Sequence, residues 1–98
     1  MKAIYKYPLQ VTDKQVLWLP WGFKILTLQV QNEVPCIWAE VNPNEKINVP
    51  VSLCTIGTGY TLVTENKYSL EYIGTYQLNK GALVLHVHQE KEDNAVSN

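Results

Sequence analysis

The sequence predicts an all-β fold, a small antiparallel β-sandwich or barrel of six to seven strands. Apolar and polar residues alternate with a period of two along most of the chain, and no stretch keeps a helical period. Proline, glycine and asparagine recur between the alternating runs, where they favour turns. A chain of 98 residues fits one domain. We expect that domain to span residues 1–89, with residues 90–98 forming a disordered acidic tail.

The first half of the chain is predicted to hold four strands. The strand over residues 24–31 alternates most clearly, so Leu26, Leu28 and Val30 are expected on its buried face. Asn32-Glu33 is expected to form a two-residue hairpin turn into the next strand, or a slightly longer loop, because glutamate is not the usual second residue of such a turn. The expected strands cover residues 3–7, 15–19, 24–31 and 34–41.

The second half continues the pattern after a loop over residues 42–46, and a further loop is expected over residues 61–67. Pro35 and Pro50 interrupt consecutive strands, which indicates a margin of the sheet. Gly74 inside its strand predicts a β-bulge or a close backbone approach. The expected strands cover residues 47–56, 70–78 and 82–88. The buried face of the last strand is expected to carry Leu83, Leu85 and Val87.

Charge and composition exclude several classes of function. The formal net charge is −1 and the eight basic residues are all lysines, none adjacent to another, so no DNA or RNA partner is expected. No apolar run is long enough to span a membrane, and residues 1–8 lack the apolar core of a signal peptide. We therefore expect a cytoplasmic protein whose Cys36 and Cys54 are buried, reduced thiols.

Catalytic and metal-binding constellations are weak. His86 and His88 share one face of a strand, but a zinc site needs three or four ligands, so no metal and no cofactor are expected. No serine lies in a nucleophile elbow, and neither cysteine has a histidine beside it in the sequence. The sequence therefore favours a protein that is not an enzyme.

A ligand-binding role has better candidates. Gly57-Thr58-Gly59-Tyr60 offers backbone N–H groups for an anion and an aromatic ring for stacking, although a turn linking two strands is the default interpretation. His86 and His88 can add donors that strengthen on protonation, and Lys24 is a candidate partner for phosphate. Trp21 belongs to an aromatic cluster typical of pockets and interfaces. The alternative for this cluster is that Trp18 fills the core and Trp21 caps it.

Six blocks of sequence are distinctive, and they cover residues 4–9, 24–32, 34–39, 57–59, 70–78 and 81–87. In this order they resemble a family of small bacteriophage and prophage proteins classed as a domain of unknown function. The resemblance extends nearly to His88 and is weaker over residues 42–51 and 61–69. It supplies no catalytic residues.

This resemblance implies a phage protein in the cytoplasm of an infected bacterial host. Such proteins often counter host defence, and one strategy is a homo-oligomer whose pockets sequester a nucleotide-derived immune signal without cleaving it. A small, charge-poor chain rich in tyrosine and tryptophan suits that strategy. The expected ligand is a cyclic nucleotide or an ADP-ribose derivative. The alternatives are a protein that inhibits a host defence enzyme and an accessory of virion assembly.

Overall fold

The structure is a computed structural model that describes residues 1–61 and 68–92. These residues form seven strands and one short 3-10 turn, η1, which confirms the all-β prediction. The described strands form two sheets and no closed barrel, so the architecture is the sandwich. Within the same residues no helix has the length and apolar character needed to cross a membrane. The elements are β1 (Ala3–Pro8), β2 (Lys14–Pro20), β3 (Lys24–Gln31), β4 (Val34–Val41), β5 (Asn48–Gly57), β6 (Tyr68–Leu78), η1 (Asn79–Gly81) and β7 (Leu83–Glu92).

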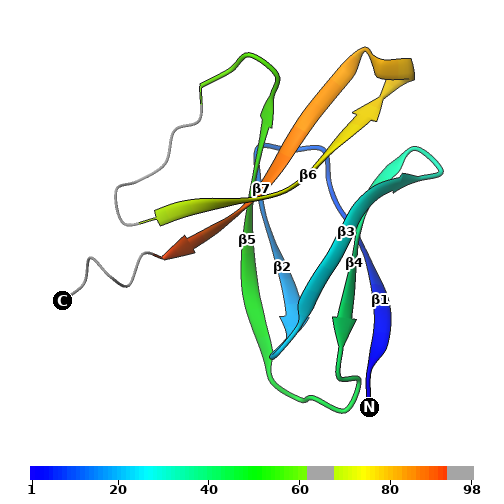
Figure 1. Cartoon of the computed structure of the whole chain (residues 1–98), viewed down its shortest axis with the longest axis vertical. Helices are drawn as coiled ribbons and strands as arrows, with labels where there is room; N and C mark the ends of the chain where they lie inside the picture. The colour runs from blue at the N-terminus through cyan, green and yellow to red at the C-terminus, as the bar shows by residue number, and fades with distance from the viewer. Residues whose placement is uncertain (62–67, 93–98) are drawn as a thin grey trace.

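The strands form two antiparallel sheets, a three-stranded sheet in the order β1-β4-β3 and a four-stranded sheet in the order β2-β5-β7-β6 (Figure 1). The β3–β4 and β6–β7 hairpins stay within their sheets. The β1–β2, β2–β3 and β4–β5 connections pass from one sheet to the other. The molecule is flat, with extents of 40 × 39 × 16 Å. Because the chain changes sheet three times, residues far apart in sequence meet in one core.

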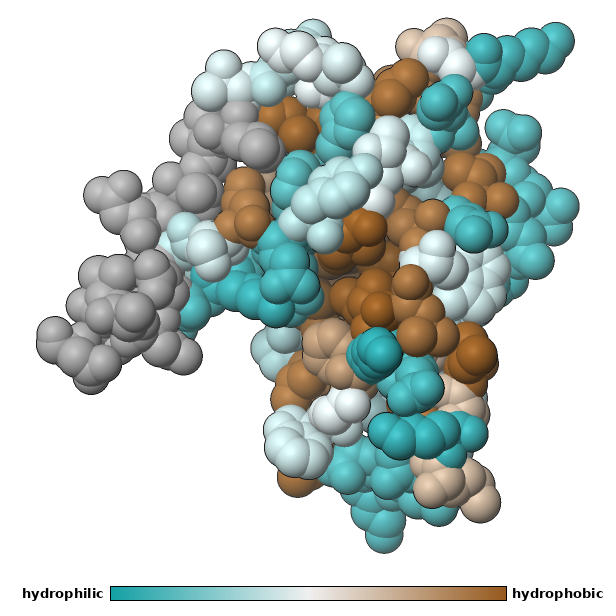
Figure 2. Space-filling model, viewed as in Figure 1, coloured by the Kyte–Doolittle hydropathy of each residue, from teal (hydrophilic) through white to brown (hydrophobic). Residues whose placement is uncertain are grey.

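The core lies where the inner faces of the two sheets meet. Its most deeply buried large side chains include Leu19, Ile37, Leu53 and Val87, contributed by β2, β4, β5 and β7. Each such burial contributes about 1.5–3 kcal/mol. The outer faces keep many apolar side chains in solvent, and Figure 2 shows hydrophobic side chains gathered near the middle of one face.

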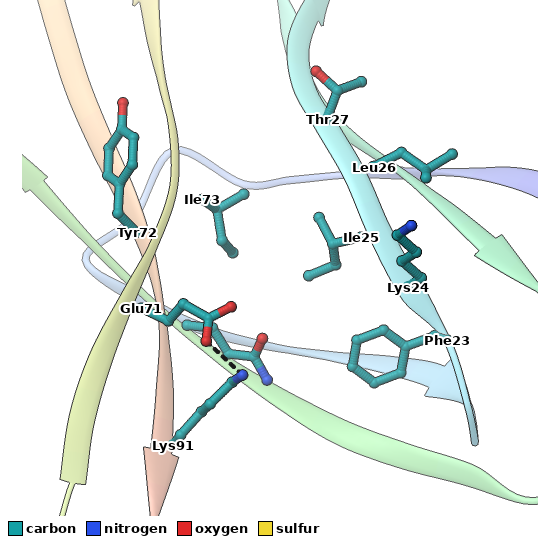
Figure 3. Close-up of a pocket in the computed structure, with 10 residues that line it drawn as sticks. Phe23, Lys24, Ile25, Leu26, Thr27, Glu71, Tyr72, Ile73 and Lys91 are labelled. Carbon is teal, nitrogen blue, oxygen red and sulfur yellow. Dashed lines mark hydrogen bonds and ion pairs between the residues drawn. The ribbon is translucent and has the colours of Figure 1, made fainter.

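The expected buried face of β3 is wrong in part. The ladder between β3 and β4 shifts register between Ile25 and Thr27, so Leu26 lies in a bulge, is exposed, and points away from the neighbouring sheet (Figure 3). Ile25 takes the inward position, and Leu28 is buried as expected. One extra residue in a strand reverses the alternation beyond it. Val30, also expected inside, is exposed because it lies one residue from the β3–β4 turn.

The last hairpin agrees better with its prediction. Val87 is fully buried, while Leu83 and Leu85 are half-buried. The ladder between β6 and β7 shifts register between Tyr72 and Gly74, which confirms a bulge at this glycine. A Cβ on Gly74 would lie 3.2 Å from Leu28 Cβ, so the expected close approach is confirmed as well. This glycine lets β6 pack against β3.

The two prolines do not mark a margin of a sheet, so that expectation is wrong. Pro35 lies in β4, the central strand of its sheet, and Pro50 lies in β5, between β2 and β7. Each lies just outside the paired stretch on one side of its strand. Pairing with β1 begins at Cys36, and pairing with β7 begins at Ser52. These positions are local equivalents of an edge, where proline is tolerated.

Two further expectations need correction, and a third falls outside the described residues. Trp18 is 62% exposed and is no core residue, because its neighbours Leu17 and Leu19 occupy the inner face of β2. The tail does not begin at residue 90, since β7 continues to Glu92 and pairs with both β5 and β6. Of the loop expected over residues 61–67, residues 62–67 lie outside the described residues, as does the rest of the tail, 93–98.

Candidate functional site

The loop that ends β5 closes as a tight turn. The backbone N–H of Tyr60 donates to the carbonyl oxygen of Gly57 at 3.2 Å, and Gly59 adopts φ = +89°, which favours glycine. A Cβ on Gly57 would lie 3.2 Å from Cδ2 of the Tyr60 ring. The ring therefore lies against the backbone of Gly57. Because the Tyr60 N–H is used within the turn, an anion would have to be held by the Thr58 and Gly59 amides.

Strand register brings both histidines to this loop. On the outer face of the four-stranded sheet His86 lies between Ile56 of β5 and Thr75 of β6, and His88 lies between Cys54 and Tyr72. The result is a cavity of about 270 Å³, which we call the outer-face pocket. It unites six of the eight residues expected at a site and adds two others. Its lining comprises Ile56, Gly57, Thr58, Gly59, Tyr60, Tyr72, His86 and His88.

Four side chains at this pocket form a continuous hydrogen-bond chain. The Thr58 hydroxyl oxygen lies 2.7 Å from His86 Nε2, and His86 Nδ1 lies 2.8 Å from the Thr75 hydroxyl oxygen. That oxygen in turn lies 2.5 Å from the hydroxyl of Tyr72. Both nitrogens of His86 are therefore engaged by threonine hydroxyls, which fixes the ring in one orientation.

His88 lies deeper than His86. Its ring contacts that of Tyr72 edge-on, with centroids 5.5 Å apart and planes at 64°. Its Nδ1 is buried and has no hydrogen-bond partner among the described residues. A buried polar atom without a partner is uncommon and needs an explanation such as a bound group or water.

Cys54 lies next to His88 in the β5–β7 ladder and is a free, buried thiol, as is Cys36. Burial raises the pKa of the Cys54 thiol, Lys14 opposes that rise, and Glu90 and Asp13 add to it. A raised pKa keeps the thiol protonated near neutral pH, and the protonated form is a poor nucleophile. Despite its histidine neighbour, Cys54 does not have the character of a catalytic cysteine.

The sequence as a whole matches a family model described as Domain of unknown function (DUF7352), over residues 1–98. The chain belongs to this family. No curated protein and no solved structure matches the chain. The family description states no function, so the outer-face pocket is the feature of this DUF7352 member from which a function has to be argued.

Two expected site residues of the DUF7352 chain lie elsewhere. Lys24 lines another cavity, of about 390 Å³ between β3 and β6, where Ile25 and Ile73 face one another (Figure 3). This cavity shares Tyr72 with the outer-face pocket. The Glu71–Lys91 ion pair, at 2.6 Å, lies at the same cavity. Trp21 is exposed at the turn between β2 and β3. Within one chain neither residue lines the outer-face pocket.

Tyr72 and Thr75 are site residues that sequence reasoning did not identify. The expected strands over residues 70–78 and 82–88 would pair Leu78 with Ala82 and place Gly74 opposite His86. The observed turn also includes Ala82, so Leu78 pairs with Leu83 and Thr75 lies opposite His86. The predicted hairpin therefore did not identify this pair. Tyr72 could not be identified either, because an unbroken ladder would put Ile73 opposite His88. Only the bulge before Gly74 moves Tyr72 into that position.

The described residues hold no group of three or more histidine, cysteine, aspartate or glutamate side chains that could bind a metal ion. Beside the outer-face pocket lies a second hollow, of about 520 Å³, which differs from the cavity lined by Lys24. It shares Gly57, Thr58 and Tyr60 with the outer-face pocket. Asp13 lies in its wall. The loop over residues 57–60 therefore stands between two hollows, and a ligand larger than one ring can extend across it.

Proposed function

We propose that this protein is a phage-encoded binding protein that sequesters a nucleotide-derived immune signal in the cytoplasm of the infected host, without cleaving it. The observation that carries the proposal is the outer-face pocket, where two tyrosines flank a floor of hydroxyl and imidazole groups. Pockets for planar heteroaromatic ligands combine aromatic surface with a few placed polar groups. The phage origin rests on the sequence resemblance.

Exposure of the tyrosines supports a stacking role. Tyr60 is 78% exposed and Tyr72 is 58% exposed, so neither ring is needed to fill the core. Stacking of a base on such a ring is worth about 1–3 kcal/mol. The loop glycine Gly57 gives the Tyr60 ring room to lie where it does.

The size of the pocket indicates how much of a ligand it holds. Its 270 Å³ is below the roughly 300–1,000 Å³ of most small-molecule sites, so it suits one heteroaromatic ring system. The remainder of a nucleotide would cross the loop toward the second hollow, where the Asp13 carboxylate suits ribose hydroxyls better than phosphate. Phosphate contacts would then come from a second copy of the chain, in keeping with a homo-oligomer.

Binding without chemistry is supported by the surroundings of His86. A histidine that acts as a general base is usually oriented by a carboxylate that also stabilises its charged form. Here a threonine hydroxyl takes that position. The buried, protonated Cys54 offers no alternative nucleophile.

Calorimetry against cyclic dinucleotides and ADP-ribose derivatives tests the proposal. Tyr60→Ala is expected to weaken binding roughly tenfold to a hundredfold through lost stacking. Gly57→Val should act similarly by displacing the Tyr60 ring. Both variants should keep the thermal midpoint, since Tyr60 packs outside the core.

Trp21→Ala serves as the control, because Trp21 is also an exposed aromatic residue but does not line the pocket. The ligand should be recovered intact after heat denaturation of the complex. Recovery of a cleaved product would mean that the protein is an enzyme. If no compound of the panel binds, the proposed nucleotide-binding function is wrong and a second candidate function takes its place.

That second candidate is an inhibitor of a host defence enzyme that docks through the sheet surface. The exposed apolar side chains around β2 favour it over a virion accessory, for which the surface offers no specific support. Such side chains in solvent are typical of protein interfaces. They include Val16, Trp18, Trp21 and Ile47.

A further inference from the structure

We infer that the outer-face pocket selects ligands that present one hydrogen-bond donor and one acceptor, and discriminates against ligands that present acceptors only. The inference rests on the proposed function and specifies its ligand. It follows from the hydrogen-bond chain that runs from Thr58 through His86 and Thr75 to Tyr72. Both ends of the chain, Thr58 and Tyr72, line the pocket.

A neutral imidazole has one donor nitrogen and one acceptor nitrogen. In one tautomer, Nδ1–H of His86 donates to the Thr75 oxygen and Nε2 accepts from the Thr58 hydroxyl. The Thr58 hydrogen is then used, so this end accepts from a ligand. The Thr75 hydroxyl donates to Tyr72, whose own hydrogen is free to be donated to the ligand.

The other tautomer reverses every bond. Nε2–H of His86 now donates to Thr58, which leaves the Thr58 hydroxyl free to donate to a ligand. Nδ1 accepts from Thr75, and Thr75 accepts from Tyr72. The Tyr72 hydrogen is used and this end can only accept. In both tautomers the two ends have opposite hydrogen-bonding character.

As long as His86 is neutral, Thr58 and Tyr72 cannot both donate to a ligand while every bond of the hydrogen-bond chain is kept. Thr58 and Tyr72 can both accept from a ligand if the Thr75 hydroxyl turns its hydrogen away from the hydrogen-bond chain. Thr75 can do this because it is exposed. The strictest discrimination is therefore against a ligand that carries acceptors only. The unpartnered Nδ1 of His88 is a second sign that the polar groups of this pocket are not complete without a bound group.

The ligand class is then a neutral planar ring with an amino or lactam N–H on one side and a ring nitrogen or carbonyl on another. Purine bases have this character. Two flat probes of matched size separate the classes without adding charge. Para-aminobenzonitrile carries a donor and an acceptor, and terephthalonitrile carries two acceptors.

Binding of both probes is measured by NMR titration at about pH 8, where histidine side chains are ordinarily neutral. The intact protein should bind para-aminobenzonitrile about threefold to tenfold more tightly, the equivalent of one hydrogen bond. Thr75→Val breaks the chain and frees both ends to donate, so the preference should disappear. Thr75→Ser retains the hydroxyl and should retain the preference.

Equal binding of the two probes by the intact protein would overturn the inference, and so would an undiminished preference in Thr75→Val. Either result would leave the proposed function standing, because a planar ligand would still occupy the pocket. If neither probe perturbs the resonances of Tyr60 and Tyr72, the proposed function fails together with the inference. Thr75 lies on the exposed outer face, so neither variant should impair folding.

Discussion

Two buried side chains that ionise at high pH, Cys54 and Tyr76, make the free energy of unfolding depend on pH in the alkaline range. Burial raises the pKa of Cys54 above its ordinary value of 9.0 and that of Tyr76 above 10.0. The folded chain therefore holds these protons to higher pH than the unfolded chain does. The contribution of these two groups to the free energy of unfolding should be constant below their unfolded-state pKa values and fall as the pH rises from those values through the folded-state pKa values.

Denaturant titrations from about pH 7 to about pH 10.5 measure this dependence. Cys54→Ala and Tyr76→Phe should each make the alkaline decline shallower, because each removes one ionisable group. Ser52 lies on the same strand as Cys54 but is not ionisable, so Ser52→Ala should leave the slope unchanged. A slope that neither Cys54→Ala nor Tyr76→Phe alters would show that these two groups do not carry the effect.

Among the elements, the close approach of β6 to β3 depends on one glycine. Gly74→Ala would place a Cβ 3.2 Å from the Cβ of Leu28, so one of the two strands would have to shift by a few tenths of an ångström. Overpacking of this kind costs about 1–3 kcal/mol. Chemical denaturation measures the loss. Ser69→Ala in the same strand, at an exposed position, is the control and should cost much less.

The β3–β4 turn offers a change in the opposite direction. Asn32 and Glu33 have φ of 52° and 67°, which makes the two-residue hairpin expected from the sequence, but glutamate is poorly suited to positive φ. Glu33→Gly should raise the free energy of unfolding by about 0.5–1 kcal/mol. The same substitution at Glu45, outside the positive-φ region, should not stabilise the protein. A loss of stability in Glu33→Gly would contradict this account of the turn.

Considered as a whole, the molecule leaves edge strands and apolar side chains unprotected. β2 is an edge of the four-stranded sheet and carries Trp18, which is 62% exposed, on its outer face. Exposed edges and aromatic patches favour self-association. We expect sedimentation at micromolar concentration to show a dimer or larger species and Trp18→Lys to reduce it.

Ile4→Lys is the matched control, because Ile4 is also 62% exposed but lies on β1, an edge of the other sheet. Dissociation by this variant alone would move the interface to the three-stranded sheet. A single species of 11.2 kDa for the unaltered protein would contradict self-association altogether.

Much of the fold and part of the site followed from local pattern. Period-two alternation and turn residues identified the strands, the Asn32-Glu33 turn and the bulge at Gly74. The residues at 57–60, with His86 and His88, were recognised as candidates because their chemistry is visible in the sequence. These features depend on neighbours within a few residues, and a linear sequence records such neighbours directly.

Tertiary structure decided the rest, because it depends on which strands pair and in what register. Leu26 lies outside the core because of a bulge that no residue type in the sequence indicates. Tyr72 reached the pocket because the shift before Gly74 moved it opposite His88, and Lys24 was carried to another cavity because β3 belongs to the other sheet. Alternation assigns side chains to one of two faces. Only the pairing of strands brings those faces together, and an inserted residue is enough to exchange them.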